Sequence, residues 1–348
     1  MSTIDLSSIT PKTMGEVIRQ HIRLALHTNI ISTTAEIAQK TGISFPTISK
    51  TLDEMNDQGE VLLNGLGLSS GGRRPKEYRL NPDFRFGLAI CLEKDFTAYT
   101  LINYVGEIIE HSTLPGVLSD GPKQLTGQID DYVRAHSNLY TLTFGVPGAV
   151  NKGRASYIPS FDNFKNFDFK TYYEAEFSIH VHAENDVNTA VYGYHDRLFN
   201  DKNLSIVYVY LGNRGIGAGV IMNGEVVRGS TSFSGEVSLL PLYDKTSFLQ
   251  AFQGSLEAAS PNEGHLDFID AMSRLVATLA ATINPHKVIF SGTYLAPSTL
   301  LDIQQRSAHY VPEENVPALE ISEWGQDYSF GLHQLTMRSM LDMGKLNI

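Results

Sequence analysis

Residues 211–220 read Leu-Gly-Asn-Arg-Gly-Ile-Gly-Ala-Gly-Val, a glycine-rich stretch that directly follows an apolar run. Backbone amides in such a stretch can hold a phosphate group. The glycines can equally permit a tight hairpin between residues 207–211 and 220–222. We favour the hairpin over a nucleotide site, because the other residues that would bind phosphate are missing from the chain, as described below.

The segments around this stretch alternate between apolar strands and helices. Strands are predicted at residues 86–92, 96–103, 140–146, 179–183 and 205–211, and a helix at 267–283. Mixed strands and helices with loops at the strand ends predict a layered α/β body. Ligands in such folds bind at the strand ends.

Two polar residues, Asn185 and Asp186, follow the strand predicted at residues 179–183. An amide donor next to a carboxylate acceptor can clamp adjacent sugar hydroxyls. Asp186 could also act as a general base on a hydroxyl if a phosphate donor were bound nearby. The alternative is a local Asx-type turn, which is the more frequent role of an isolated Asn-Asp pair.

Composition and charge exclude several classes of protein. The chain has 348 residues and one cysteine, Cys91, so it can form no intramolecular disulfide and no Cys-rich metal site alone. It has no apolar run of membrane-spanning length and no signal-peptide pattern, so we expect a cytoplasmic protein without a membrane partner. The net charge of −11 argues against nucleic acid, but a slightly basic first 80 residues precede a strongly acidic remainder.

The first 80 residues predict three helices. The first covers 14–26, and the second follows the capping pattern of residues 32–36 and stops at Gly42. The third starts at Ser44 and continues to Gly59. A short helix, a glycine-containing turn and a longer helix are the arrangement of a helix-turn-helix.

Inward packing of the apolar residues of the third helix leaves a polar outer face. This face carries Ser44, Thr47, Ser49 and Lys50. Short hydroxyls and a cation suit contacts with phosphate oxygens and base edges of DNA. The alternative is a small helical bundle whose polar face is only solvated, and the helices alone do not separate the two.

A hairpin that follows these helices favours DNA. Residues 61–63 and 76–80 predict its two strands, with Arg73 and Arg74 at the tip and Lys76 at the start of the returning strand. Arginines at a tip can follow phosphates or enter a minor groove. A hairpin of this kind beside a recognition helix is a wing; the alternative is an interdomain linker with incidental charge.

The hairpin sequence also resembles a known family. Residues 69–75 (Ser-Ser-Gly-Gly-Arg-Arg-Pro), followed by Arg-Leu-Asn-Pro at 79–82, resemble the wing and linker of ROK family transcriptional repressors, of the xylose and N-acetylglucosamine repressor type. Further stretches resemble the patterns of this family in the same order: Gly-Val-Pro-Gly at 145–148, Glu-Asn-Asp-Val-Asn at 184–188, residues 211–220, Ser-Gly-Glu-Val at 234–237 and residues 284–292.

The resemblance implies a fold and its domains. Residues 1–82 would form an N-terminal all-α winged helix-turn-helix domain. Residues 83–348 would form an α/β two-lobed body of the actin-like ATPase and sugar-kinase (ribonuclease H-like) class. One lobe would comprise about 83–185 together with a C-terminal helix at 325–348, and the other 186–324.

The resemblance also implies a set of sugar contacts in the body. These are Asn185, Asp186, Glu236, Glu257 and Ser160, the last standing where many relatives have Asn. Phe164 is the aromatic residue of the loop at 161–169 that we expect beside the sugar, and its neighbours are expected in the core.

Other positions depart from the pattern of the kinases in this family. Their Asp-x-Gly-x-Thr turn is replaced by Cys-Leu-Glu-Lys-Asp at 91–95, where Glu93 and Asp95 would repel ATP phosphates. Because phosphoryl transfer depends on charge neutralisation, we expect no catalytic residue and no nucleotide cofactor. Serines at 238 and 255 stand near or at zinc-ligand positions of the family, so we expect no metal.

These features lead to one main hypothesis and two alternatives. The main hypothesis is a sugar-responsive repressor of carbohydrate metabolism genes, which binds operator DNA and whose catalytically silent body senses a sugar or sugar phosphate. We expect a homodimer or a dimer of dimers, because a hinge motion in the body can then change half-site spacing. The alternatives are an active ATP-dependent sugar kinase with a regulatory DNA-binding head, and a regulator that reads a protein partner.

Overall fold

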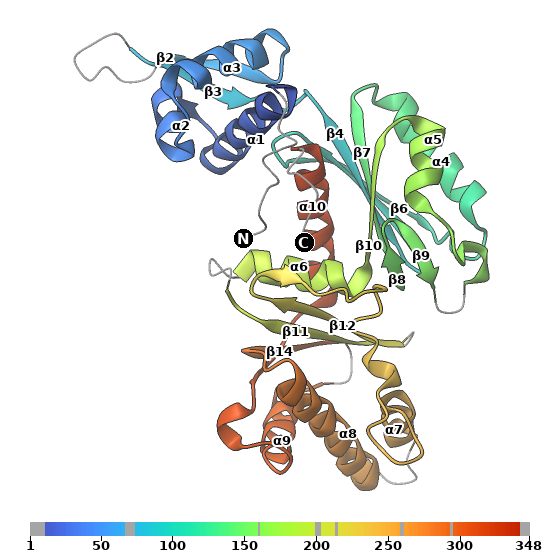
Figure 1. Cartoon of the computed structure of the whole chain (residues 1–348). Helices are drawn as coiled ribbons and strands as arrows, with labels where there is room; N and C mark the ends of the chain where they lie inside the picture. Colours follow the sequence, from blue (N-terminus) through green and yellow to red (C-terminus); the bar gives the residue numbers. More distant parts are fainter. Residues whose placement is uncertain are drawn as a thin grey trace.

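The computed structural model describes residues 11–66, 74–158, 161–198, 203–212, 215–257, 261–292 and 295–341. An N-terminal group of helices lies at one end of the molecule, and two five-stranded sheets with their own helices form the rest (Figure 1). No helix of the described residues is long and apolar enough to cross a membrane.

The N-terminal part, which we call the head (residues 11–80), contains the three expected helices. They are α1 (Pro11–Asn29), α2 (Thr34–Thr41) and α3 (Phe45–Asp57). Thr33 and Glu36 form the capping box of α2, and Gly42 ends that helix in the left-handed conformation with φ 71°. Buried Ile37, Ile48 and Leu52 join the helices in one core.

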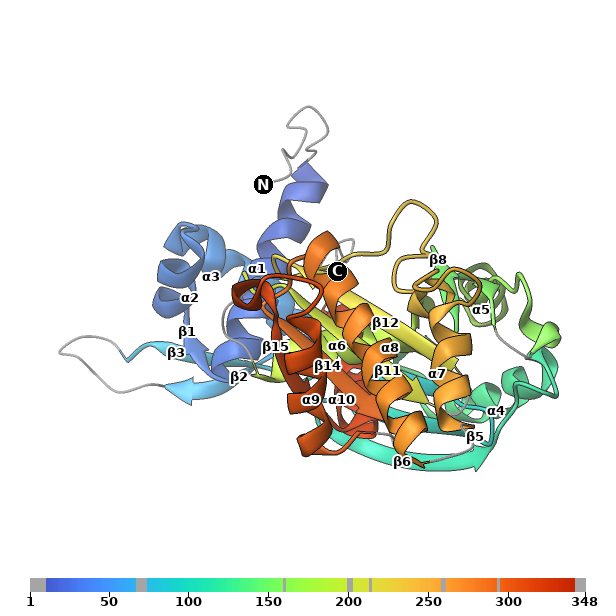
Figure 2. The ribbon, with the colours of Figure 1, turned by 90° about the horizontal axis from the view of Figure 1, so that it is seen from below.

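The head is not purely helical, so the expectation of an all-α domain needs correction. A three-stranded antiparallel sheet has the order β1-β3-β2, with β1 at Ser32–Thr33, β2 at Val61–Leu66 and β3 at Lys76–Leu80. The β2–β3 hairpin extends away from the body (Figure 2), and residues 67–73, which include Arg73, lie outside the described residues. The short β1 escaped the sequence analysis because it has no periodicity of its own. It pairs only with a distant strand, for example Ser32 with Tyr78, 46 residues away.

The first sheet of the body has the strand order β10-β7-β4-β5-β6. Its strands are β4 (Phe86–Leu92), β5 (Phe96–Asn103), β6 (Ile108–Pro115), β7 (Leu139–Val146) and β10 (His180–Asn185). Helices α4 (Pro122–Ala135) and α5 (Phe169–Phe177) pack on one face, where their apolar residues share a core with those of β4 and β7. The small hairpin β8 (Ala149–Asn151) and β9 (Arg154–Tyr157) follows β7.

The second sheet has the strand order β13-β12-β11-β14-β15. Its strands are β11 (Ile206–Gly212), β12 (Gly215–Met222), β13 (Glu225–Val226), β14 (Lys287–Gly292) and β15 (Ala318–Ile321). Antiparallel pairing of β11 with β12 from Ile206 to Gly212 confirms the hairpin expected for the glycine-rich stretch. Helices α7 (Phe248–Leu256), α8 (Pro261–Thr282) and α9 (Pro297–Ser307) cover the outer face (Figure 1).

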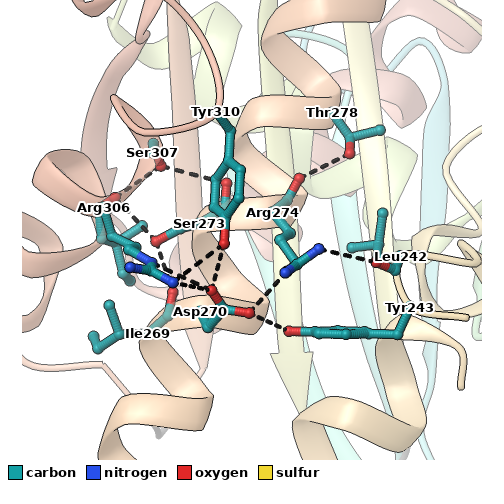
Figure 3. A network of polar contacts seen from close by, with 11 residues as sticks. Leu242, Tyr243, Ile269, Asp270, Ser273, Arg274, Thr278, Arg306, Ser307 and Tyr310 are labelled. Atoms are coloured by element: carbon teal, nitrogen blue, oxygen red, sulfur yellow. Dashed lines mark hydrogen bonds and ion pairs between the residues drawn. The ribbon is translucent and has the colours of Figure 1, made fainter.

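A carboxylate holds α8 and α9 together. Asp270 Oδ2 accepts hydrogen bonds from Tyr243 (2.9 Å) and Arg274 (2.8 Å), and its Oδ1 accepts from Arg306 (2.9 Å) and Tyr310 (2.5 Å), as Figure 3 shows. Burial alone would raise the pKa of Asp270, but the hydrogen bonds of Tyr310 and the two arginines hold that pKa below its usual range. This cluster is structural, because its donors satisfy both carboxylate oxygens.

Two helices lie between the sheets, α6 (Asp186–Leu198) and α10 (Trp324–Met340) (Figure 1). They cross in direct backbone contact: a Cβ on Gly193 would lie 2.1 Å from the Asp327 carbonyl oxygen, and one on Gly331 only 2.0 Å from that of Thr189. Helix α10 also packs on β4 and β7 of the first sheet. The domain boundaries expected at residues 82 and 185 fall between described elements, and they stay predictions.

Candidate functional site

A cavity of about 500 Å³ is lined by residues from both sheets of the body. They come from the β4–β5 turn, the ends of β7 and β10, the β11–β12 hairpin and the start of α10. The lining residues with charged or aromatic side chains are Glu93, Lys94, Phe161, Asp186, Tyr210, Glu236 and Trp324. The cavity therefore combines carboxylates with aromatic rings.

Asp186 is the first residue of α6 and lines the cavity. Its Oδ1 accepts hydrogen bonds from the backbone N–H of Val187 (2.8 Å) and the amide of Asn185 (3.0 Å). Burial, together with the negative charges of Glu93 and Glu236, raises the pKa of Asp186 to about 8. At neutral pH this carboxyl group is therefore mainly protonated and can donate as well as accept a hydrogen bond.

Asn185 also lines the cavity, but its side chain has a local role. Its Nδ2 donates to the Gly148 carbonyl oxygen (2.9 Å), and its Oδ1 accepts from the backbone N–H of Asn188 (2.8 Å), which caps α6. This is a helix N-cap, with the bond three residues on, and not the Asx-type turn considered from the sequence; both are local structural roles. A sugar contact of Asn185 stays a prediction, and it would use the remaining acceptor capacity of Oδ1.

Glu236 is brought to the cavity by the turn at Gly235. That glycine has φ 96°, and a Cβ there would lie 1.8 Å from the Ala218 carbonyl oxygen, so no other residue fits. The same turn is held to β12 by a 2.7 Å hydrogen bond from the Ala218 N–H to the Gly235 carbonyl. Burial raises the pKa of Glu236. The turn therefore brings the carboxyl group of Glu236 to the same cavity as Asp186, and its contact with a sugar stays a prediction.

An ion pair that the sequence analysis missed supports these residues. Arg228 Nε donates to Glu184 Oε2 (3.1 Å), and Glu184 Oε1 accepts from the backbone N–H of Asn185 (3.0 Å) and the amide of Asn188 (3.1 Å). The pair joins the end of β10 to the segment that leads from β13 to Glu236. Glu184 lay inside a quoted motif, but nothing local signals its partner 44 residues away.

Aromatic residues form another wall that the sequence analysis did not find. Tyr210 and Trp324 line the cavity with ring centroids 4.1 Å apart, and Tyr328 lies behind with its ring 5.2 Å from that of Trp324. The expectation for Phe164 is wrong: it is fully buried in the core, stacked 5.6 Å from Phe169. Phe161 lines the cavity instead.

Two further predicted sugar contacts have other locations. Glu257 follows α7, is exposed and is not among the residues that line the cavity. Ser160 lies outside the described residues. Of the two carboxylates expected to face a nucleotide, Glu93 lines the cavity and Asp95 does not. Within the described parts of the chain, no group of three His, Cys, Asp or Glu residues could hold a metal ion.

The predicted DNA-contacting residues lie along α3 and the hairpin. Ser44 and Lys50 are exposed, Thr47 and Ser49 are half-buried, and Ser44 Oγ hydrogen bonds to Thr47 Oγ1 (2.8 Å). Lys50 Nζ lies 3.9 Å from Glu54 on the same helix. These side chains share the N-terminal half of α3.

The hairpin residues lie beside the other half of α3. Arg74 and Lys76 are exposed, and Lys76 Nζ lies 3.6 Å from Asp53 Oδ1. The acidic residues Asp53, Glu54 and Asp57 are all exposed on the C-terminal half of α3. The polar face of this helix is therefore divided into a hydroxyl- and lysine-bearing half and an acidic half.

Comparison with known proteins relates the body to one family, because residues 94–248 match the model of the ROK family. This part of the chain is a ROK family domain. It contains Asp186 and Glu236, whereas Glu93 and Trp324 lie outside the matched residues. The cavity thus extends beyond the segment by which the family is recognised.

Curated relatives of the ROK domain include repressors and kinases. The chain is 27% identical over 228 residues to the "Xylose repressor" of Caldicellulosiruptor bescii, which covers 62% of this chain and 56% of that protein. It is 27% identical over 215 residues to the "Xylose repressor" of Bacillus subtilis (58% and 54%). It is 29% identical over 133 residues to the "Beta-glucoside kinase" of Listeria innocua (38% and 45%). The chain spans about half the length of the curated relatives it matches.

Solved structures share the fold over more of the chain. A ROK family transcriptional regulator, described as a homolog of the E. coli MLC protein, is similar with a TM-score of 0.71 and 16% identity over 95% of this chain and 98% of that one. A putative N-acetylmannosamine kinase from Listeria monocytogenes has a TM-score of 0.59 and 18% identity over 74% and 99%. Because the match to the regulator covers 95% of the chain, it includes most of the head, whereas the kinase match spans 74%.

Proposed function

We propose that this protein is a sugar-responsive DNA-binding transcriptional repressor of carbohydrate metabolism genes, whose ROK domain belongs to a sensor and not to an enzyme. The observation that carries the proposal is the combination, in one chain, of a head with an exposed polar helix and a body with a cavity of carboxylates and aromatic rings. The names of the xylose repressors among the relatives support it.

In this proposal the head is a winged helix-turn-helix. Helices α2 and α3, joined at Gly42, form the helix-turn-helix, and the β2–β3 hairpin with Arg73, Arg74 and Lys76 is the wing. The N-terminal half of α3 enters the major groove with Ser44, Thr47, Ser49 and Lys50. The acidic C-terminal half points away from the phosphates, which would repel it.

The effector is a sugar held in the cavity. Its hydroxyls would bond to Asp186, Glu236 and Asn185, while an aromatic wall receives its C–H face. Glu257 and Ser160 complete the proposed contact set, with Glu257 approaching when the two sheets close on the ligand. Among the described lining residues the cation Lys94 is outnumbered by the carboxyl groups of Glu93, Asp186 and Glu236, so the cavity favours an uncharged sugar over a sugar phosphate.

An active ATP-dependent sugar kinase is the second candidate, and the kinases among the relatives favour it. Asp186 occupies a strand end from which its ionised form could take a proton from a sugar hydroxyl. The carboxylate of Glu93 on the wall of the same cavity argues against ATP, because it would repel the phosphates. We therefore propose no nucleotide cofactor and no catalytic residue. Because serines at 238 and 255 stand near or at the zinc-ligand positions of the family, we also propose no metal.

The proposed partners are operator DNA and the sugar. We propose a homodimer or a dimer of dimers in the cytoplasm, in which closure of the body around the sugar changes the spacing of two heads and weakens their hold on two half-sites. The effect of the sugar on DNA affinity then equals the effect of DNA on sugar affinity.

The test is a pair of assays on the purified chain. DNA selected by the protein from a random library is labelled, and its binding is followed by fluorescence anisotropy with and without D-xylose, other neutral pentoses and hexoses, and their phosphates. We expect a neutral sugar to change DNA affinity. A coupled assay with ATP, Mg²⁺ and the same sugars separates the second candidate, since clear turnover would establish a kinase. A protein that selects no DNA would contradict the repressor.

A further inference from the structure

Helix α10 extends from the cavity to the head. Its first residue, Trp324, lines the cavity, and Met340 at its other end lies in one apolar cluster with Ile22 and Leu26 of α1. With 17 residues the helix is about 25 Å long. Figure 1 shows it passing between the two sheets toward α1. One rigid element therefore touches both functional parts of the molecule.

The cavity end of α10 can respond to a ligand. The indole of Trp324 is half-buried, rests on Tyr210 at 4.1 Å between ring centroids, and faces the same cavity as Asp186 and Glu236. A sugar ring offers an apolar C–H face to an aromatic ring and hydroxyl groups to carboxylates. A sugar between Trp324 and the carboxylates would thus use both kinds of contact at once.

The middle of α10 is fixed to the helix that carries Asp186. Gly193 of α6 and Gly331 of α10 bring the two helix backbones into direct contact, with no side chain between them. Asp327 of α10 is fully buried and accepts hydrogen bonds from Arg197 of α6 (2.5 Å) and Tyr208 of β11 (3.0 Å). Because α6 and α10 are packed and hydrogen bonded together, a displacement of Trp324 would move the two helices as a unit.

The head end of α10 continues into a line of polar contacts. Arg85 Nη1 donates to the Met340 carbonyl oxygen (2.9 Å), and its guanidinium lies 5.9 Å from the ring centre of Tyr104. The hydroxyl of Tyr104 donates to Glu60 Oε1 (2.8 Å), and Glu60 pairs with Arg23 of α1 at 2.6 Å. Glu60 follows α3 closely, so this line reaches both the first and the third helix of the head.

We propose that Trp324 is the stacking residue for the effector and that α10, with Arg85 at its head end, carries the effect of effector binding to the DNA-contacting helices. This inference rests on the proposed function and assigns its coupling to named residues. This coupling requires that α10 has two positions and that the sugar binds more tightly, through its contact with Trp324, when the helix is in one of them.

Trp324 is the only tryptophan of the chain, so tryptophan emission reports on the surroundings of this one side chain. D-Xylose and the other neutral sugars of the panel are titrated while tryptophan emission is recorded, and calorimetry gives an independent affinity. We expect the sugar that binds by calorimetry to shift or quench the emission. In calorimetry, Trp324→Phe should keep the affinity within about threefold, and Trp324→Ala should weaken it about tenfold or more. Binding by calorimetry with unchanged emission would overturn the inference while leaving the repressor intact.

The second measurement concerns the head end. The factor by which the sugar changes DNA affinity is measured for the full chain, for Arg85→Gln and for the matched control Arg134→Gln. Arg134 is exposed, and its partner Asp130 lies on the same helix α4. We expect about a tenfold factor in the unmodified chain and the control. For Arg85→Gln we expect a factor below about threefold, with sugar affinity and sugar-free DNA affinity unchanged.

A second variant keeps the proposal testable if Arg85→Gln does not fold. Tyr104→Phe removes only the hydroxyl that bonds to Glu60 and should also reduce the factor. If the sugar changes DNA affinity by the same factor in a folded variant as in the unmodified chain, the proposed role of α10 is wrong. Failure of every sugar and every DNA to bind would overturn the proposed function itself, and the inference with it. Calorimetry and anisotropy on the unmodified chain distinguish these outcomes.

Discussion

The hydroxyl of Tyr104 donates a 2.8 Å hydrogen bond to Glu60, so the turn after β5 in the body is bonded directly to the residue that precedes β2 in the head. Both side chains are buried, and Glu60 is also the ion-pair partner of buried Arg23. Breaking a buried ion pair leaves an uncompensated charge, whereas loss of one hydroxyl removes a single hydrogen bond.

The first prediction concerns this buried pair. Glu60→Ala should lower the free energy of unfolding by about 3–5 kcal/mol, because Arg23 loses its buried carboxylate. Tyr104→Phe should cost about 1 kcal/mol. Urea denaturation followed by circular dichroism measures both. The control is Glu54→Ala, whose partly exposed pair with Arg19 is worth at most about 1 kcal/mol. Equal losses for Glu54→Ala and Glu60→Ala would contradict the prediction.

The second prediction concerns the pH dependence introduced by Asp186. Its pKa of about 8 in the folded protein exceeds its value in an unfolded chain, so the folded state binds more protons between these two values. Stability should therefore fall as the pH rises from about 4 to 8. Asp186→Asn should flatten this slope and stabilise the protein at pH 8 by roughly 1–3 kcal/mol.

Urea midpoints at pH 5.5 and 8 measure the effect of Asp186→Asn. Glu257→Gln is a suitable control, since that carboxylate is exposed after α7 and should leave the slope unchanged. A slope that is the same in Asp186→Asn and the unmodified protein would show that Asp186 does not titrate in this range. The same Asn variant should bind the effector sugar more weakly while keeping sugar-free DNA binding.

The third prediction concerns the polar face of the head. Lys50→Ala and Arg74→Ala should each weaken DNA binding and lower the slope of log affinity against log salt by about one, because each phosphate contact releases about one counterion. Anisotropy titrations at several salt concentrations measure this. Lys40→Ala on α2 is the matched control, as Lys40 contacts Asn29 and lies outside the proposed face. If only Lys40→Ala lowered the salt dependence of DNA binding, the DNA would have to lie on another surface of the head.

The fourth prediction concerns the crossing of α6 and α10. Gly331→Ala would place a Cβ 2.0 Å from the Thr189 carbonyl oxygen, so the two helices must separate. We expect a loss of about 3 kcal/mol or more in unfolding free energy, comparable with severe overpacking. Gly127→Ala on α4 has open space around its Cβ and should instead stabilise by about 0.5–1 kcal/mol. A tolerated Gly331→Ala would mean that the crossing can widen freely.

Local patterns were sufficient for much of the fold and for part of the cavity. The capping box of Thr33 and Glu36, the stop at Gly42 and the β11–β12 hairpin were predicted because each depends on residues close together in the chain. Asp186 was expected to follow its strand for the same reason, whereas Glu236 was implied by the resemblance to the ROK family. The expectation for Phe164 failed because four phenylalanines in one short loop carry no signal of which one is buried.

The amino-acid sequence by itself indicated several helices and strands with their caps and turns, since these follow from periodicity and from the conformations of single residues. The motifs that mark the ROK domain came from the resemblance to that family. Only the tertiary structure decided that Trp324 lines the cavity, that Arg228 pairs with Glu184 and that Tyr104 bonds to Glu60. The physical reason is that such contacts join residues tens to hundreds of positions apart, whose meeting depends on how α6 and α10 pack between the two sheets.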